Sequence, residues 1–274
     1  LSEEEKEKQL AVFRQYGGAT SSNEPTVIDL FEAQVERTPA AAAVEFGDTT
    51  VTYEQLNKRV NQLAYYLQNK GVKQEQRVGI LAEHSIEMVI ACLAILKAGG
   101  AYVPIDPEYP QERIEYLLED SGVEWLLTHP MKGLTYAYHG EKIDITQPDL
   151  YTGPSDNLAE AITSDQTAYC IYTSGTTGRP KGVLIHHLGL ANYIDWAKQV
   201  YVRGETRHFA LYTSLSFDLT VTSIFTPLIS GNTIMIYHHE NRQLLVEDII
   251  KDNRVHVMKL TPSHLQFIKH LSFP

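Results

Sequence analysis

The sequence predicts an α/β protein in which parallel or mixed β-sheets carry helices on both faces. Two observations lead to this fold class. Short apolar segments typical of strands alternate with longer amphipathic segments along most of the chain, and such alternation favours strands joined by covering helices. The chain also has 274 residues, of which 43% are hydrophobic. That is enough to bury a large core, so the composition excludes a mainly disordered protein.

The first sheet region is expected over residues 26–165. Residues 1–25 are interpreted as a charged lead-in helix and an inter-domain linker. Thr52 and Gln55 match a capping box, in which each side chain bonds the other residue's backbone N–H, so a helix is expected over 51–71. Periodicity and the Gly, Pro and Asp positions give the other elements of this half: helices over 26–37, 85–98 and 110–121, and strands over 77–81, 101–105 and 123–127.

The second sheet region is expected over residues 166–274, after a loose connection rich in Pro, Gly, Ser and Asp at 130–165. The same alternation continues here. The predicted strands are 167–172, 182–185, 233–237 and 256–260, and the predicted helices are 187–199, 219–228, 243–252 and 263–271.

Charge, cysteines and apolar segments limit the function classes. There are 23 basic and 34 acidic residues, a net charge of −11, which disfavours nucleic acid and anionic lipid as partners. Cys92 and Cys170 lie singly in apolar segments, which predicts buried, reduced thiols rather than disulfides. The longest apolar segment, 88–96, is far shorter than the ~20 residues of a membrane-spanning helix. We therefore expect no membrane partner and a cytoplasmic location.

The segment YTSGTTGRPKG, residues 172–182, carries the strongest chemical signal. Its glycines allow close approach of the backbone to a ligand, and successive backbone N–H groups in such a turn fit phosphate oxygens. Lys181 is followed by Gly182 rather than Ser or Thr, so the segment is not a P-loop, and its glycine spacing differs from that of dinucleotide-binding turns. A flexible surface loop is the alternative for a generic segment of this composition.

This segment resembles the phosphate loop of adenylate-forming enzymes, a superfamily that includes acyl-CoA synthetases, luciferases and the adenylation domains of nonribosomal peptide synthetases. Three further segments resemble motifs of the same superfamily: VTYEQL at 51–56, LKAGGAYVPID at 96–106, and FDLT at 217–220. The form of the segment 96–106 is typical of peptide synthetases. The resemblance runs from about residue 26 to the last residue and implies the N-terminal core of an adenylation domain.

The resemblance implies a reaction and the residues that support it. An amino-acid carboxylate attacks the α-phosphorus of ATP, aided by Mg²⁺, and gives an aminoacyl-adenylate and pyrophosphate. The acyl group then passes to the phosphopantetheine thiol of a peptidyl carrier protein. The implied catalytic and phosphate-binding residues are Thr173, Ser174, Thr176, Thr177 and Lys181, and Gly175 and Gly178 complete the phosphate-binding loop.

Four residues are implied to bind the amino acid. Asp218 matches the anchor of the substrate ammonium, and its alternative role is a helix N-cap. Leu219 and Thr222 are expected to line the side-chain pocket, and Lys259 to reach into it from the strand 256–260, with a surface lysine as the alternative. This combination resembles pockets that select aspartate or asparagine.

The chain departs from the family pattern because it ends before several downstream motifs, including those of the C-terminal lobe and its catalytic lysine. We therefore expect an incomplete domain whose partners include the remainder of the adenylation domain and neighbouring synthetase domains. Two alternatives stay open. One is an acyl- or aryl-CoA ligase, which Asp218 and the segment 96–106 disfavour. The other is a catalytically incomplete interaction fragment.

Overall fold

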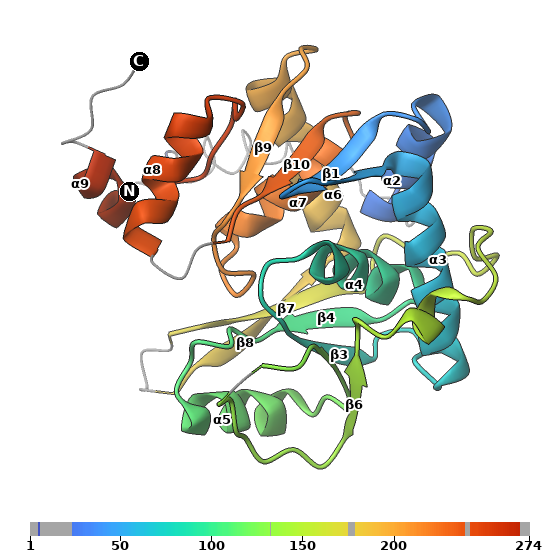
Figure 1. The fold of residues 1–274 in the computed structure, drawn as a ribbon. Helices are drawn as coiled ribbons and strands as arrows, with labels where there is room; N and C mark the ends of the chain where they lie inside the picture. Colours follow the sequence, from blue (N-terminus) through green and yellow to red (C-terminus); the bar gives the residue numbers. More distant parts are fainter. Residues whose placement is uncertain (1–4, 6–23, 132, 175–178, 239–241, 269–274) are drawn as a thin grey trace.

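A computed structural model describes residues 5, 24–131, 133–174, 179–238 and 242–268. These residues form two β-sheets with a layer of helices between them, and further helices on the outer faces (Figure 1). The mixed α/β class predicted from the sequence is confirmed. Within the described part of the chain, no helix is long and apolar enough to cross a membrane.

The larger sheet has six strands in the order β6-β5-β3-β4-β7-β8. Neighbouring strands run parallel except at one edge, where β8 runs antiparallel to β7. The strands are β3 (Arg77–Leu81), β4 (Ala101–Pro104), β5 (Trp125–Thr128), β6 (Glu141–Asp144), β7 (Thr167–Thr173) and β8 (Lys181–His186).

The smaller sheet has four strands in the order β2-β1-β10-β9. They are β1 (Ala42–Phe46), β2 (Thr49–Thr52), β9 (His208–Leu211) and β10 (Thr233–Ile236). Strand β1 from early in the chain pairs in parallel with β10, placing Val44 beside Ile234. Each sheet thus takes strands from both sides of the boundary expected near residue 166, and that boundary does not separate the sheets.

The helices follow the predicted alternation closely. They are α2 (Val27–Arg37), α3 (Tyr53–Asn69), α4 (Ile86–Lys97), α5 (Gln111–Ser121), α6 (His187–Ala197), α7 (Leu219–Leu228), α8 (Arg242–Asp252) and α9 (Pro262–Ile268). A 3₁₀ turn spans Pro148–Tyr151 and a π turn follows α6 over Lys198–Val202. The predicted capping box begins α3: Thr52 N–H donates to Gln55 Oε1 at 3.0 Å, and Gln55 N–H donates to Thr52 Oγ1 at 3.2 Å.

Several predictions differ from the structure. The strand expected over 256–260 is wrong: Val257 forms a single bridge to Phe209, and the backbone N–H groups of 256 and 257 both donate to the His208 carbonyl. Two donors on one acceptor do not propagate a ladder, so the segment is not a strand. Strands β1, β2, β6 and β9 were not predicted, and residues 51–52 end β2 rather than begin a helix. The lead-in helix over 1–25 lies almost entirely outside the described residues.

Helix α4 lies between the two sheets and is buried along nearly its whole length (Figure 1). Its last residue, Lys97, has a side chain that is only 1% exposed. The Lys97 ammonium lies 2.5 Å from Glu32 Oε1 of α2. It also donates to the side-chain oxygens of Asn61 at 2.6 Å, Asn57 at 2.7 Å and Asn157 at 3.1 Å. One buried cation therefore joins α2, α3, α4 and the loop that contains Asn157.

Candidate active site

The phosphate-loop segment joins the antiparallel strands β7 and β8 at the edge of the larger sheet. The register ends with Tyr172 opposite Gly182 and Thr173 opposite Lys181. Strand β7 is buried up to Tyr172, whereas Thr173, Ser174 and Lys181 are exposed. The sheet thus brings three of the predicted residues together with their side chains accessible. Gly175, Thr176, Thr177 and Gly178 lie outside the described residues.

Gly182 is required at its position by close packing against β7. A Cβ atom added there would lie 2.7 Å from Cys170 Sγ and 3.2 Å from Tyr172 Cζ. The Cys170 thiol is free and buried, as is that of Cys92, which confirms the prediction for both cysteines. Burial raises the pKa of the Cys170 thiol. Glycine at residue 182 therefore lets the second strand of the hairpin approach the first without displacing the side chain of Cys170.

Asp218 lies at the start of α7, and its side chain makes no capping hydrogen bond. The preceding segment is fixed to the larger sheet, since Ser216 Oγ donates to the Pro104 carbonyl at 3.2 Å. The pKa of Tyr169 is raised to about 12, first by burial and then by the negative charge of Asp218, and Tyr193 contributes in the same direction. Asp218 is thus an electrostatic neighbour of Tyr169, which belongs to the strand that leads into the phosphate-loop segment. The N-cap alternative for Asp218 receives no support from a capping bond.

Thr222 and Lys259 are connected through three aromatic side chains. The buried Thr222 Oγ1 lies 2.8 Å from the Tyr193 hydroxyl. Tyr193 stacks on Trp196 with ring centroids 5.9 Å apart, and Trp196 meets Tyr201 edge-on at 5.8 Å. The Lys259 ammonium lies 5.1 Å from the Tyr201 ring centroid, a distance that permits cation–π attraction. We call Tyr193, Trp196 and Tyr201 the aromatic wall.

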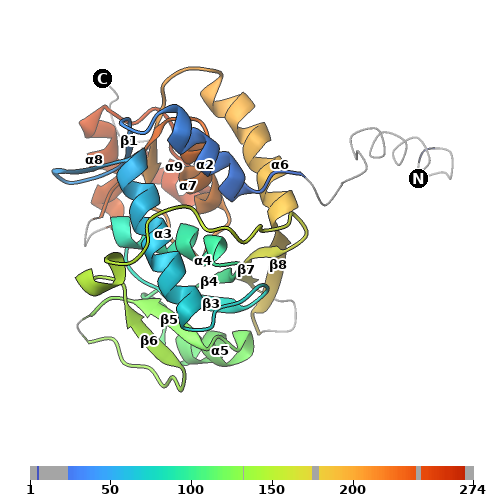
Figure 2. The same ribbon diagram turned by 90° about the vertical axis from the view of Figure 1, so that its right-hand side faces the viewer.

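The aromatic wall is a feature that the sequence analysis missed. Tyr193 and Trp196 are three residues apart on α6, and therefore share one helix face. They are 36% and 50% exposed. Neighbouring large aromatic side chains that are this exposed form an apolar surface that is available to a ligand or partner. Helix α6 continues directly from the end of β8 (Figure 2). The signal in the sequence was the i, i+3 pair of aromatic residues directly after the hairpin.

Leu219 and Lys259 occupy less enclosed positions than Thr222. Both are half-buried. The Lys259 carbonyl accepts a hydrogen bond from the Tyr212 hydroxyl at 2.5 Å, so the backbone of this residue is tied to the end of β9 although the segment is not a strand. The structure therefore places Lys259 by a side-chain tether rather than by the predicted ladder.

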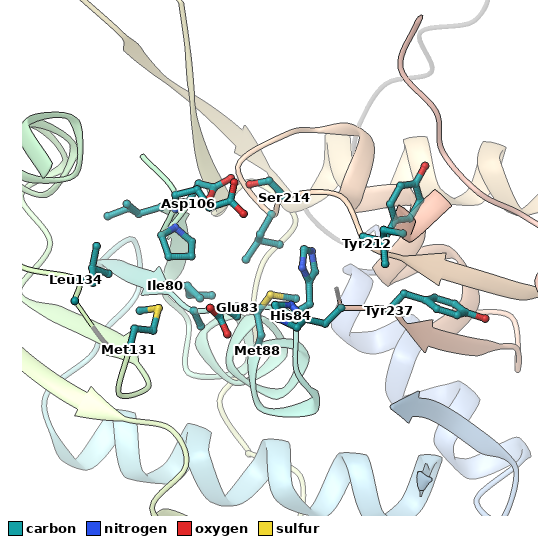
Figure 3. A pocket seen from close by; sticks show the side chains of 18 residues that line it. Ile80, Glu83, His84, Met88, Asp106, Met131, Leu134, Tyr212, Ser214 and Tyr237 are labelled. Carbon is teal, nitrogen blue, oxygen red and sulfur yellow. Dashed lines mark hydrogen bonds between the residues drawn. The ribbon is translucent and has the colours of Figure 1, made fainter. Parts of the chain in front are cut away.

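A cavity of about 290 Å³ lies beyond the carboxyl ends of β3, β4, β9 and β10 (Figure 3). Its lining includes Glu83, His84, Asp106 and Ser214, and His84 Nε2 lies 2.8 Å from the Thr213 carbonyl across the gap between the sheets. Crevices at this edge are where ligands bind in open α/β sheets. None of the predicted site residues that the structure describes lines the cavity, but the segment that includes Ser214 leads directly into Asp218.

The described residues contain no group of three or more His, Cys, Asp or Glu side chains that could hold a metal ion. A magnesium ion bound mainly through substrate phosphates and water needs only one or two protein carboxylates. The geometry of the described residues therefore offers no complete protein cage for a divalent cation.

Comparisons with known proteins agree with this arrangement. Residues 31–274 match the family described as AMP-binding enzyme. Bacitracin synthase 3 of Bacillus licheniformis is 52% identical over 247 residues, which are 90% of this chain and 4% of that protein. Tyrocidine synthase 3 of Brevibacillus parabrevis is 48% identical over 271 residues, 99% of this chain and 4% of that protein.

Solved structures show the same fold. The AMPPNP-bound form of the nonribosomal peptide synthetase FmoA3 has a TM-score of 0.83 and 29% identity over 91% of this chain and 27% of that one. The N-terminal subdomain of Klebsiella oxytoca NpsA, in complex with 3-hydroxyanthranilyl-AMSN, has a TM-score of 0.77 and 25% identity, and the match covers 63% of that chain.

The chain belongs to the AMP-binding enzyme family. Within that family its relatives are peptide synthetases, which confirms the predicted resemblance to their adenylation domains. It spans only 4% of the length of each of these two curated relatives.

Proposed function

We propose that this chain forms part of an adenylation domain that activates an amino acid with ATP, giving an aminoacyl-adenylate and pyrophosphate. The observation that carries the proposal is the placement of Asp218. Its carboxylate does not cap α7 and neighbours Tyr169 on the strand that ends in Thr173. Tyr169 and Thr173 belong to the same strand, which supports one common site for the proposed ammonium anchor and the proposed phosphate loop.

In this proposal the two ends of the site have separate tasks. Thr173, Ser174 and Lys181 contact the β- and γ-phosphates, together with Gly175, Thr176, Thr177 and Gly178 of the same segment. Hydrogen-bond donors and the Lys181 ammonium, when held in place, stabilise the negative charge that develops on the phosphates during the reaction. Asp218 holds the substrate ammonium by a charge-assisted hydrogen bond, which fixes the carboxylate for attack on the α-phosphorus.

We propose aspartate as the substrate, with asparagine as the second candidate. Thr222 is buried behind the hydroxyl of Tyr193, and Lys259 is the cation at the other end of the aromatic wall. A substrate carboxylate or amide oxygen would pair with the Lys259 ammonium while the ammonium of the substrate pairs with Asp218. Leu219, at the start of α7, supplies apolar contact between them.

The proposed partners follow from the reaction. Mg²⁺ enters with ATP, carried by the phosphates, and neutralises part of their charge. The activated acyl group passes to the phosphopantetheine thiol of a peptidyl carrier protein. The names of two relatives, bacitracin synthase 3 and tyrocidine synthase 3, support a place for this reaction in peptide-antibiotic synthesis. An ATP-dependent reaction and two free cysteines suit the cytoplasm.

An aryl-acid ligase is the second candidate, and one observation favours it. The N-terminal subdomain of NpsA, a structural neighbour at 25% identity, is bound to an aryl-acid adenylate analogue. Asp218 separates the two candidates, since an aryl acid without an ammonium group has no use for a carboxylate at the start of α7.

The proposal is tested by ATP–pyrophosphate exchange with all twenty amino acids and with a set of aryl acids, using the full-length protein. We expect exchange with aspartate or asparagine. Exchange with a large apolar amino acid alone would reject the proposed substrate, and exchange only with aryl acids would reject amino-acid activation. No exchange with any acid would favour the interaction-fragment alternative.

Replacing Lys259 with alanine tests the substrate assignment. Lys259 is half-buried in the free protein, and the proposed pair with the substrate carboxylate is desolvated only when the substrate covers it. Loss of one partner of a desolvated charge pair costs on the order of 2–5 kcal/mol, so we expect kcat/KM for the acidic substrate to fall at least about 30-fold. Lys251→Ala is the matched control, because Lys251 is an exposed lysine that pairs with Glu247 on α8. An equal effect of both substitutions would contradict the assignment.

A further inference from the structure

Helix α5 presents two polar side chains to the base of the phosphate-loop hairpin. Tyr116 and Asp120 are four residues apart on this helix and therefore share one face. The helix lies against the outer face of the larger sheet, below β3 and beside β8 (Figure 1). Neither residue belongs to the segments that carry the family resemblance.

The first contact holds the strand that enters the loop. The Tyr172 hydroxyl donates to Asp120 Oδ2 at 2.7 Å, and Tyr172 directly precedes Thr173. Its side chain is 8% exposed. Burial, and then the bond and charge of Asp120, raise the pKa of Tyr172, so its hydroxyl stays protonated and remains a donor at neutral pH.

The second contact holds the strand that leaves the loop. The Tyr116 hydroxyl donates to the Pro180 carbonyl at 3.0 Å and also lies 3.3 Å from Asp120 Oδ1. Proline has no N–H, so its carbonyl is the one backbone group of residue 180 that can be anchored by a hydrogen bond. The Arg179 guanidinium lies 5.8 Å from the Tyr116 ring centroid. Residues 179 and 180, directly before Lys181, are thus tied to the same helix face.

We propose that Asp120 and Tyr116 are positioning residues that hold both ends of the phosphate loop, so that Thr173, Ser174 and Lys181 face the triphosphate of ATP. The inference rests on the proposed function. Hydrogen bonds to Tyr172 and Pro180 reduce the conformational freedom of the residues that flank the loop, and groups that are already ordered bind a ligand with less entropic cost. The two residues act through Tyr172 and Pro180, and neither one contacts the nucleotide.

A positioning role and a purely structural role make different predictions. If the contacts only fasten α5 to the sheet, their loss lowers thermal stability and affects all substrates equally. If they position the loop, their loss weakens binding of the β- and γ-phosphates and leaves AMP and the amino acid unaffected.

The experiment uses the full-length protein with the variants Asp120→Ala, Asp120→Asn, Tyr172→Phe and Tyr116→Phe. Binding of AMPPNP and of AMP is measured by calorimetry, and pyrophosphate exchange gives KM for ATP and for the amino acid. For Asp120→Ala and Tyr172→Phe we expect the Kd of AMPPNP and the KM of ATP to rise on the order of tenfold, as for loss of one hydrogen bond to a charged group. The Kd of AMP and the KM of the amino acid should stay within twofold, a margin well below that effect.

Two comparisons among the variants sharpen the result. Asp120→Asn keeps one acceptor oxygen and should recover part of the defect of Asp120→Ala. The double variant Asp120→Ala/Tyr172→Phe should be no worse than Asp120→Ala alone, because Tyr172→Phe removes a bond that the loss of Asp120 has already removed. The controls are Glu119→Gln, an exposed neighbour on α5, and Tyr138→Phe, which removes a hydroxyl bonded to the Val123 carbonyl. We expect both controls to behave as the wild type.

Three outcomes in the variants would overturn the inference: unchanged AMPPNP binding, equal losses for AMPPNP and AMP, or additive effects in the double variant. The proposed function fails separately, when the wild-type protein shows no acid-dependent exchange with any amino acid. The ratio of AMPPNP to AMP affinity then still decides the inference. A wild type that binds AMPPNP no better than AMP also overturns it.

Discussion

The helical layer between the sheets and the β7–β8 hairpin are built by opposite means. In the layer, one fully buried ammonium, that of Lys97, joins four segments through polar side chains. In the hairpin, β8 is an edge strand with exposed side chains, held by its ladder to β7 and, near the loop, by the contacts from α5. The buried layer therefore concentrates stability, and the exposed edge leaves side chains free for a ligand.

This difference predicts where substitutions act. Changes in the buried layer should lower the free energy of unfolding more than changes at the exposed hairpin. Two substitutions and one change of pH test this difference in stability, from the largest expected effect to the smallest.

Lys97→Met is expected to be the most destabilising. It removes one partner from a buried network and leaves the Glu32 carboxylate and three asparagine oxygens without their cation. Breaking such a pair costs about 3–5 kcal/mol, measured as the free energy of unfolding in urea. Lys58→Met, at an exposed lysine of α3, is the control and should change little. A loss below about 1 kcal/mol, the range of a surface pair, would show that the layer does not depend on this cation.

Lowering the pH should lower the free energy of unfolding through His187. This residue begins α6 and directly follows strand β8 of the hairpin. Burial lowers the pKa of His187 from the ordinary 6.5 to about 4, so the folded protein holds it neutral. Between these two values the unfolded chain binds a proton that the folded protein does not, and stability falls as the pH is lowered. The shift predicts a loss of about 3 kcal/mol between pH 7 and pH 4.

Urea unfolding at pH 7 and pH 4 measures this effect, with His187→Gln as the comparison. Glutamine does not titrate, so the free energy of unfolding of the variant should depend less on pH over this range. Among the described residues, His187 Nδ1 has no hydrogen-bond partner, so the substitution breaks no bond at that atom. Equal pH dependence in the variant and the wild type would exclude His187 as its cause.

Gly182→Ala should have the smallest effect, about 1–3 kcal/mol, because the added methyl group meets Cys170 and the neighbouring atoms must shift. Gly189→Ala is the matched control: its Cβ would lie 3.8 Å from Ile185 Cγ2, an ordinary contact. The control lies inside α6, where alanine is favoured over glycine, so it should be neutral or slightly stabilising. Thermal unfolding distinguishes the two. Equal melting temperatures would show that the hairpin tolerates a wider separation.

Local signals in the sequence predicted the parts of the fold that depend on neighbouring residues. The capping box at Thr52, strand β3 and helix α7 agree with the structure because each is specified by adjacent side chains. Strands β1 and β9 were missed because four or five residues carry little periodicity, and their pairing partners are distant in sequence. The segment 256–260 was predicted wrongly because an apolar pattern does not reveal whether an edge is available for pairing.

In the candidate site, too, features specified by neighbouring residues were predicted, and features that depend on residues distant in sequence were not. The motif itself identifies the hairpin, and register places Thr173 beside Lys181. The aromatic wall and the contacts of Asp120 depend on side chains from α5, α6 and the π turn meeting in space. No local pattern encodes such meetings, so they required the structure.

The pairing of β1 with β10 also has a consequence for biosynthesis. A ribosome releases β1 long before Ile234 and its neighbours exist, so the smaller sheet cannot close until most of the chain has emerged. Until then, the apolar edge of β1 has no native strand beside it, and long-range closure of this kind is slow and prone to aggregation. A nascent chain stalled before β10 should therefore be a stronger client for chaperones than one stalled just after it.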